Sequence, residues 1–262
     1  MTGDPADASA LLAHLPGLAF AFVLVLSRVG FAVALLPGLG ESEPPPMLRA
    51  GLALAVTALL LPGVAPLVPD RPVDAWHTAA MVGAELLYGG LLGWLARLLA
   101  LSLPVAGALV ATLAGLASVL QPDPAQGGQA TAIGRLFGVM VPVLVLSTGL
   151  YALPLQALAG SYRLVAPGAW LPVGAAAESV VGAVAECFGL ALQLAAPFLL
   201  AGLVSQAAMG LLARLVPQVQ VYSVATPVQI LGALLLLGLL AGGMVDTWGE
   251  AVRAGWSALP GL

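Results

Sequence analysis

The amino-acid sequence predicts an all-α integral membrane protein, and three properties of the chain support this fold class. Of its 262 residues, 61% are hydrophobic and 8% are charged, and the mean hydropathy is +1.06. A soluble domain averages roughly 45–50% apolar and about 25% charged residues, so this chain has too little polar surface to cover itself in water. The apolar residues also gather in runs about as long as a bilayer is thick, separated by short stretches rich in Pro, Asp and Glu.

Six apolar runs predict the helices, because each is near or above the roughly 20 residues that a membrane span requires. They are Leu15–Leu36, Leu48–Val68, Met81–Leu103, Phe137–Leu158, Val180–Leu215 and Val228–Met244. The first is expected to be a retained helix, since the residues before it are acidic and lack the basic region of a signal peptide. The fifth is too long for one simple crossing, so we expect it to tilt, break near Pro197 or extend beyond the bilayer. We predict that residues 1–262 form a single domain. We also predict that its helices do not form a bundle of six equal spans.

The charge distribution bears on the orientation of the chain in the membrane and on the classes of partner that it could bind. All eight basic residues are Arg, and they fall near the ends of successive runs on both expected sides of the membrane. The positive-inside rule needs an asymmetry between the sides, so the sequence does not set the orientation. A net charge of -4 without a basic face argues against nucleic-acid binding.

The sequence contains no recognisable catalytic site. It has no H-E-x-x-H motif, no Walker loop and no G-x-S-x-G elbow. Cys187 is alone in an apolar run, which argues against a disulfide framework or a Cys/His metal site. His14 and His77 lie at the edges of apolar segments without a partner at helical spacing. We therefore predict a protein that is not an enzyme and needs no cofactor and no metal.

Four ionisable residues lie inside apolar runs, namely Arg28, Glu85, Arg97 and Glu186. A charge that faces lipid near the middle of a helix is unfavourable by about 2.5–3.5 kcal/mol, so such side chains usually face protein or water. Arg28 is interpreted as a salt-bridge partner between helices or subunits, with the lining of a conduit as the alternative. Glu85 and Arg97 are candidates for the same roles.

Glycine and proline positions predict how the helices pack and bend. Three glycine pairs have the spacing that lets helix backbones approach closely in lipid: Gly89 with Gly93, Gly134 with Gly138, and Gly238 with Gly242. Three prolines are expected to kink apolar runs or free backbone carbonyls: Pro142, Pro154 and Pro197. Tight helix packing and contact between subunits are therefore expected.

Four stretches, in order along the chain, carry a family resemblance. Arg28 precedes a Pro-rich loop and Pro45–Ala55, which reads P-P-M-L-R-A-G-L-A-L-A; Gly83–Gly93 holds Glu85 and regularly spaced glycines. Residues Gly115–Pro124 end in Asp-Pro, and Arg214–Tyr222 reads R-L-V-P-Q-V-Q-V-Y. In order, spacing and composition these stretches resemble the FliR family of flagellar export-gate proteins, which has relatives in type III injectisomes.

The resemblance implies an assembly. Members of the family build, with FliP and FliQ, the core of the gate through which unfolded flagellar subunits pass, and their helices form a spiral partly raised above the membrane plane. The resemblance further implies that FlhB-like and FlhA-like export components are partners. It also implies a multi-pass protein surrounded by lipid in the bacterial inner membrane, at the flagellar basal body. Five residues are then expected to make buried polar or subunit contacts: Arg28, Glu85, Arg97, Arg214 and Gln218.

The segment before Asp-Pro is expected to help close the gate. The prolines and glycines of Gly115–Gly128 cannot continue a helix that begins near Val105, and its polar groups are unfavourable against lipid. By the resemblance, the plug residues are Ala117, Ser118, Val119, Leu120, Gln121, Pro122, Asp123 and Pro124. Many family members carry aromatic residues here, whereas this chain offers Val119 and Leu120 for a constriction that excludes water. A plain surface loop is the alternative.

Two other functions stay open at this point. The chain could be the injectisome counterpart of the flagellar protein, which neighbouring genes would decide. A secondary transporter of a small solute is the rival from a different class, but it would need an inverted repeat and convergent polar groups at mid-depth. Neither feature is found in the sequence.

Overall fold

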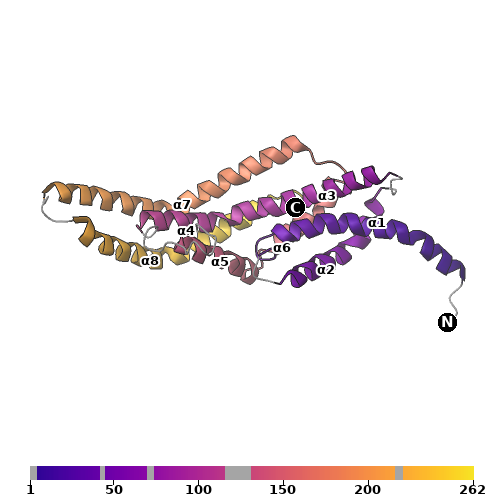
Figure 1. Cartoon of the computed structure of the whole chain (residues 1–262), viewed down its shortest axis with the longest axis horizontal. Helices are drawn as coiled ribbons and strands as arrows, with labels where there is room; N and C mark the ends of the chain where they lie inside the picture. The colour runs from indigo at the N-terminus through magenta and orange to yellow at the C-terminus, as the bar shows by residue number, and fades with distance from the viewer. Residues whose placement is uncertain (1–4, 42–44, 70–73, 116–130, 216–220) are drawn as a thin grey trace. The chain divides into compact units, whose positions relative to one another are not determined.

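The computed structural model describes residues 5–41, 45–69, 74–115, 131–215 and 221–262, and these residues form helices and connections without a strand. The helices are α1 (Pro5–Leu35), α2 (Pro46–Val64), the short 3-10 helix η1 (Ala65–Leu67), α3 (Ala75–Ala100), α4 (Ser102–Leu113), α5 (Ala132–Ser147), α6 (Ala152–Leu164), α7 (Val173–Leu215) and α8 (Val221–Ser257) (Figure 1). The predicted all-α fold class is confirmed.

Within the described parts of the chain, five helical segments are long and apolar enough to cross a membrane, and a bent pair would make six. Their lengths are very unequal. α7 has 43 residues and α8 has 37, which is about 64 and 56 Å at 1.5 Å per residue, roughly twice the hydrocarbon thickness of a bilayer. α7 continues through Pro197, so the long fifth run extends rather than breaks there. Six equal spans are not formed, as the sequence predicted.

The predicted single helix over Phe137–Leu158 is wrong. The run divides into α5 and α6, whose axes differ by 70° across the break at residues 148–151. Gly149 adopts φ +73, the left-handed conformation in which glycine commonly ends a helix. Pro154 then lies in the first turn of α6, where its missing N–H leaves no helical hydrogen bond unmade.

The chain forms two compact units, one made of residues 1–97, 148–181 and 256–262, the other of residues 98–147 and 182–255. In the first unit α1 packs along α2. Its core joins apolar side chains of α1, α2, α3 and α6: Val25, Val29, Ala32, Val33, Val64, Tyr88, Leu92, Leu158 and Tyr162. This core surrounds the polar groups described below.

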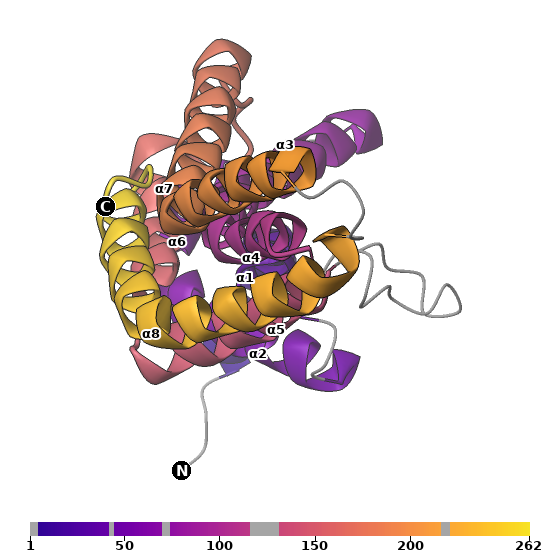
Figure 2. The ribbon, with the colours of Figure 1, turned by 90° about the vertical axis from the view of Figure 1, so that its left-hand side faces the viewer.

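In the second unit α4 packs along α5 (Figure 2). Glycine makes this close contact possible. A Cβ atom added to Gly107 would lie 2.8 Å from the ring of Phe137 and 3.0 Å from the Cα of Gly134. A Cβ atom added to Gly134 would lie 3.2 Å from the carbonyl oxygen of Pro104. The helix backbones therefore approach closely at Gly107 and Gly134, whereas Gly138, the other member of the predicted pair, would meet only the side chain of Pro104 at 4.0 Å.

Candidate functional site

The close approach of α1 and α3 creates the site. A Cβ atom added to Gly89 would collide with the backbone carbonyl of Arg28. One turn further along α3, a Cβ atom on Gly93 would lie 2.8 Å from both the carbonyl oxygen of Ala32 and the Cβ of Leu35. Glycine at both positions lets the two backbones touch. This contact places the side chain of Arg28 directly against the preceding turn of α3.

Arg28 and Glu85 form a bidentate ion pair in the first unit. Arg28 Nε donates to Glu85 Oε2 at 2.7 Å, and a terminal nitrogen donates to Oε1 at 2.9 Å. Both side chains are 0% exposed. Paired N–H groups aimed at paired oxygens make the strongest ion-pair geometry in proteins, and its directionality fixes α1 against α3.

The remaining polar atoms of the pair bind α6 and the connection that follows it. One terminal nitrogen of Arg28 donates to Ser161 Oγ at 3.1 Å, and both terminal nitrogens donate to the carbonyl of Val165 at 3.3 Å. Glu85 Oε1 also accepts the backbone N–H of Gly168 at 2.7 Å. Arg28 and Glu85 therefore join α1, α3, α6 and the α6–α7 connection at one point.

Two tyrosine rings lie close to the guanidinium group. Its central carbon lies 4.2 Å from the ring centroid of Tyr162 and 4.6 Å from that of Tyr88. Cation–π attraction of this kind strengthens when water is excluded. The hydroxyl of Tyr162 donates to the carbonyl of Val25 at 3.4 Å, which ties the ring back to α1. We call Arg28, Glu85, Tyr88, Ser161, Tyr162, the Val165 carbonyl and the Gly168 amide the Arg28 cluster.

The α6–α7 connection is shaped to fit the cluster. Gly168 has φ +81, a conformation that other residues adopt with strain, and a Cβ atom there would also collide with the side chain of Met81. Glycine at this position lets the backbone N–H reach the carboxylate of Glu85 while Met81 fills the space beside it. The turn Ala166-Pro167-Gly168 is thus a structural part of the cluster.

The Arg28 cluster is closed rather than open to a ligand. Five hydrogen bonds leave the guanidinium group, one from Nε and two from each terminal nitrogen, which uses every N–H that arginine offers. The rings of Tyr88 and Tyr162 also lie against the group. Such an arrangement can position helices, but it leaves no donor free to hold a substrate. Of the two interpretations of Arg28, this geometry favours the structural one.

Arg97 makes a second, more exposed ion pair in the same unit. It donates to Glu41 Oε2 at 3.4 Å and to the carbonyl of Leu35 at 3.3 Å, near the end of α1. The side chains of Arg97 and Glu41 are 28% and 21% exposed, so water screens their attraction. Arg97 therefore contributes less to the packing of α1 against α3 than Arg28 does.

No contact within the described residues links the other residues singled out from the sequence to the cluster. Arg214 is exposed in the last turn of α7, and Glu186 is exposed on the same helix. Gln218 and the plug residues 117–124 lie outside the described residues. Among the residues that the structure describes, no group of three or more His, Cys, Asp and Glu side chains could hold a metal ion.

Sequence reasoning missed the aromatic and hydroxyl members of the cluster. Tyr88 follows Glu85 by three residues, so both lie on one face of α3, and this signal was available. Ser161 and Tyr162 stand together near the end of an apolar run, but nothing local in the sequence links them to Arg28, which is 133 residues from Ser161. Only the folded arrangement brings them together.

Comparison with known proteins gives matches over nearly the whole chain. A sequence profile of the family described as bacterial export proteins, family 1, matches residues 19–255. Flagellar biosynthetic protein FliR of Caulobacter vibrioides is 32% identical over 230 residues, which is 88% of this chain and 92% of that protein. FliR of Bacillus subtilis is 25% identical over 221 residues, covering 83% and 84%. Yop proteins translocation protein T of Yersinia pestis is 28% identical over 221 residues, covering 82% and 84%.

Proposed function

The chain belongs to family 1 of the bacterial export proteins, the family of FliR, and on this premise we propose that it is a membrane subunit of a type III protein export gate. The observation that carries the proposal is the match over residues 19–255, which includes the complete Arg28 cluster. A flagellar biosynthetic protein and a Yop translocation protein both match this chain over more than four fifths of its length, and we take protein export as the function common to the two. The resemblance found in the sequence is confirmed.

We propose the flagellar system in preference to the injectisome. The identity to the Caulobacter flagellar protein is 32% with 92% of that protein covered, against 28% and 84% for the Yersinia translocation protein. The injectisome counterpart is the second candidate, and the match to the Yersinia protein is what favours it. The genes beside this one, flagellar or injectisome, would separate the two.

The partners that we propose are FliP-like and FliQ-like membrane subunits, joined by FlhB-like and FlhA-like export components. The exposure of the helices supports partners or lipid around this multi-pass membrane protein. Only 6% of the most apolar window in α8, and 17% of that in α2, is buried within the chain. Helices this apolar must be covered by lipid or by other apolar helices. The location proposed is the bacterial inner membrane, at the flagellar basal body.

Within this function, the role proposed for the Arg28 cluster is to position α1, α3 and α6 for assembly. Its charges are fully paired, so the cluster contributes directionality rather than a binding site. The segment 117–124 is proposed, from its residues and the family resemblance, to help seal the closed gate. Unfolded exported proteins are the proposed cargo, and the chain supplies no catalytic group for their passage.

Deletion of the gene, followed by complementation, tests the proposed function. A strain without the gene should be non-motile and should not release hook and filament proteins into the medium, although their synthesis continues. Expression of the intact chain should restore both. Normal release of both filament protein and injectisome substrates from the deletion strain would overturn the proposal, whereas loss of injectisome substrates alone would assign the chain to the second candidate.

A further inference from the structure

The last turn of α4 is held by a side chain from another helix of the second unit. Gly115 has φ +70, the left-handed conformation in which glycine commonly ends a helix. The carbonyl of Val110 still accepts a backbone N–H, that of Ala114 at 2.8 Å. The carbonyl of Leu113, three residues further on, accepts the side-chain amide of Gln229 on α8 at 3.2 Å. Gln229 therefore caps the end of α4 from outside the helix.

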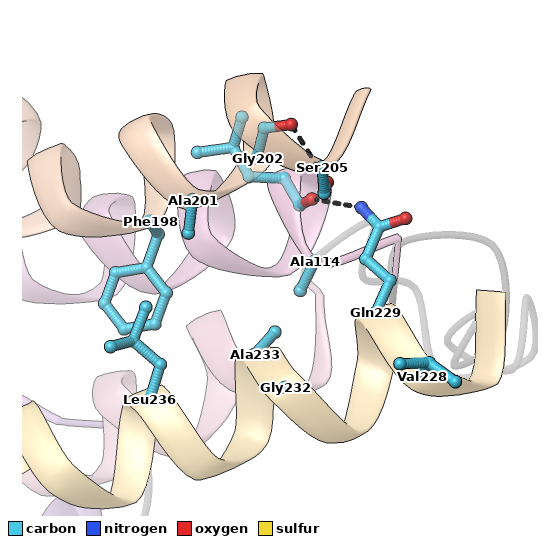
Figure 3. Close-up of a pocket in the computed structure, with 11 residues that line it drawn as sticks. Ala114, Phe198, Ala201, Gly202, Ser205, Val228, Gln229, Gly232, Ala233 and Leu236 are labelled. Atoms are coloured by element: carbon cyan, nitrogen blue, oxygen red, sulfur yellow. Dashed lines mark hydrogen bonds between the residues drawn. The ribbon is translucent and has the colours of Figure 1, made fainter. Parts of the chain in front are cut away.

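The bond between Gln229 and α4 lies in apolar surroundings. Figure 3 shows Gln229 reaching from α8 toward the end of α4, beside Ala114. The pocket at this point is lined mostly by apolar side chains, among them Phe198, Ala201, Val228 and Leu236. Carbonyl groups at the end of a helix have no partner within it, and a low dielectric makes an unpaired one costly. The bond is also directional, so it fixes α8 in one register against α4.

α7 holds the same end of α4 by close packing. A Cβ atom added to Gly202 would lie 3.8 Å from the Cβ and from the carbonyl oxygen of Leu113, which is ordinary van der Waals contact. Ser205, on the next turn of α7, donates its hydroxyl to the Gly202 carbonyl at 3.0 Å, within its own helix. The end of α4 therefore has a packing contact with α7 and a hydrogen bond with α8.

We propose that Gln229 is a positioning residue of the export gate, through which α8 holds the end of α4 where the gate segment begins. This role rests on the proposed function, in which residues 117–124 help seal the gate. Those residues lie outside the described part of the chain, but only three residues separate Leu113 from Ala117 in the sequence. A change in the position of Leu113 is therefore passed on to the start of the segment through the covalent chain.

Gln229→Met tests this role, because methionine is about as long as glutamine but has no N–H to donate. Gln206→Met is the matched control, since Gln206 is exposed on α7. The measurements are the yield of the complex purified with its partner subunits and its ion conductance in planar bilayers. We expect Gln229→Met to raise the conductance about fivefold at unchanged yield, which corresponds to the roughly 1 kcal/mol that one hydrogen bond contributes. Gln206→Met should change neither value.

A disulfide that takes over from the hydrogen bond supplies a rescue. Leu113→Cys with Gly202→Cys places two Cβ atoms 3.8 Å apart, the usual separation in a disulfide, and Cys187→Ala removes the one native thiol. Oxidation then joins the end of α4 to α7 without Gln229. In this background we expect oxidation to return Gln229→Met to the conductance of the chain that keeps Gln229, and reduction to raise it again. A loss of stability elsewhere in the chain would not respond to this disulfide.

Three results would overturn the proposal, and they are separable from failure of the proposed function. One is Gln229→Met with unaltered conductance in a preparation where deletion of residues 117–121 raises it; the proposed function then stands. Another is a leak in Gln229→Met that persists when mass spectrometry shows the disulfide formed, because the end of α4 is then not what Gln229 controls. If the deletion itself leaves the conductance unchanged, the segment is not the seal and the role of Gln229 falls with it.

Discussion

Replacing one member of the buried ion pair tests the role of the Arg28 cluster most sharply. Arg28→Leu removes the five hydrogen bonds of the guanidinium and leaves the Glu85 carboxylate buried with the amide of Gly168 as its protein donor. Removing one partner of a buried pair typically destabilises a protein by about 3–5 kcal/mol, because an uncompensated charge stays in an apolar interior. Membrane insertion should continue, since α1 becomes more apolar.

The double replacement Arg28→Leu with Glu85→Leu should be less destabilising than either single one. Both charges are then absent, and apolar side chains in place of a buried pair are often neutral or stabilising. Since native domains are stable by about 5–15 kcal/mol, each single replacement should remove a large part of the stability of the first unit. The expected coupling between the two positions is therefore favourable and several kcal/mol in size.

The assay is unfolding in mixed micelles as sodium dodecyl sulfate is increased, followed by the helical circular dichroism signal, together with the yield of the assembled complex. Arg97→Leu is the matched control, since its pair with Glu41 is partly exposed and should contribute about 1 kcal/mol or less. Single replacements at Arg28 and Glu85 that lose no more than Arg97→Leu would refute the reasoning, as would normal complex yield and normal motility in Arg28→Leu.

Three further outcomes follow from the same contacts. Gly89→Val should prevent the contact of α1 with α3 and lower the yield of folded chain, whereas Gly83→Val on the same helix meets open space and should be tolerated, as measured by size-exclusion profiles. Trp256→Phe should lower stability by about 1 kcal/mol more than Trp248→Phe, because the Trp256 indole donates to a backbone carbonyl at 3.1 Å, whereas the buried Trp248 indole has no hydrogen-bond partner among the described residues; comparing detergent melting curves checks this. Deleting residues 117–121 should leave the complex intact but raise ion conductance in planar bilayers, and a conductance equal to that of the unaltered complex would show that this segment is not the seal.

The fold class could be predicted from composition, but the break between α5 and α6 could not be placed. The chain has 61% apolar residues, in runs long enough to span a membrane, and these two properties predicted a helical membrane protein. The structure confirms this fold class. The break at residues 148–151 rests on one left-handed glycine, Gly149, in a chain that has 32 glycines. Most of these sit in helices, so glycine by itself was too common a signal to locate the bend.

The sequence singled out Arg28 and Glu85 as site residues, but it did not predict that they pair with each other. Arg28 and Glu85 stood out because charges are rare in apolar runs, and the spacing of Gly89 and Gly93 marked the helix face beside Glu85. Their pairing across 57 residues depends on the packing of α1 against α3, which no local pattern encodes. The same spacing at Gly238 and Gly242 faces nothing within 4 Å in the described residues, so spacing alone did not identify the contacts.

The measurement that tests the central claim most directly is purification of the full chain, tagged at its own gene, from native membranes in a mild detergent. We expect FliP-like and FliQ-like subunits to stay bound through size-exclusion chromatography, and the yield of that complex to fall in Arg28→Leu while Arg97→Leu retains it. A chain that purifies without these subunits from cells that produce them, at a yield unchanged by Arg28→Leu, would contradict the assignment as an export-gate subunit.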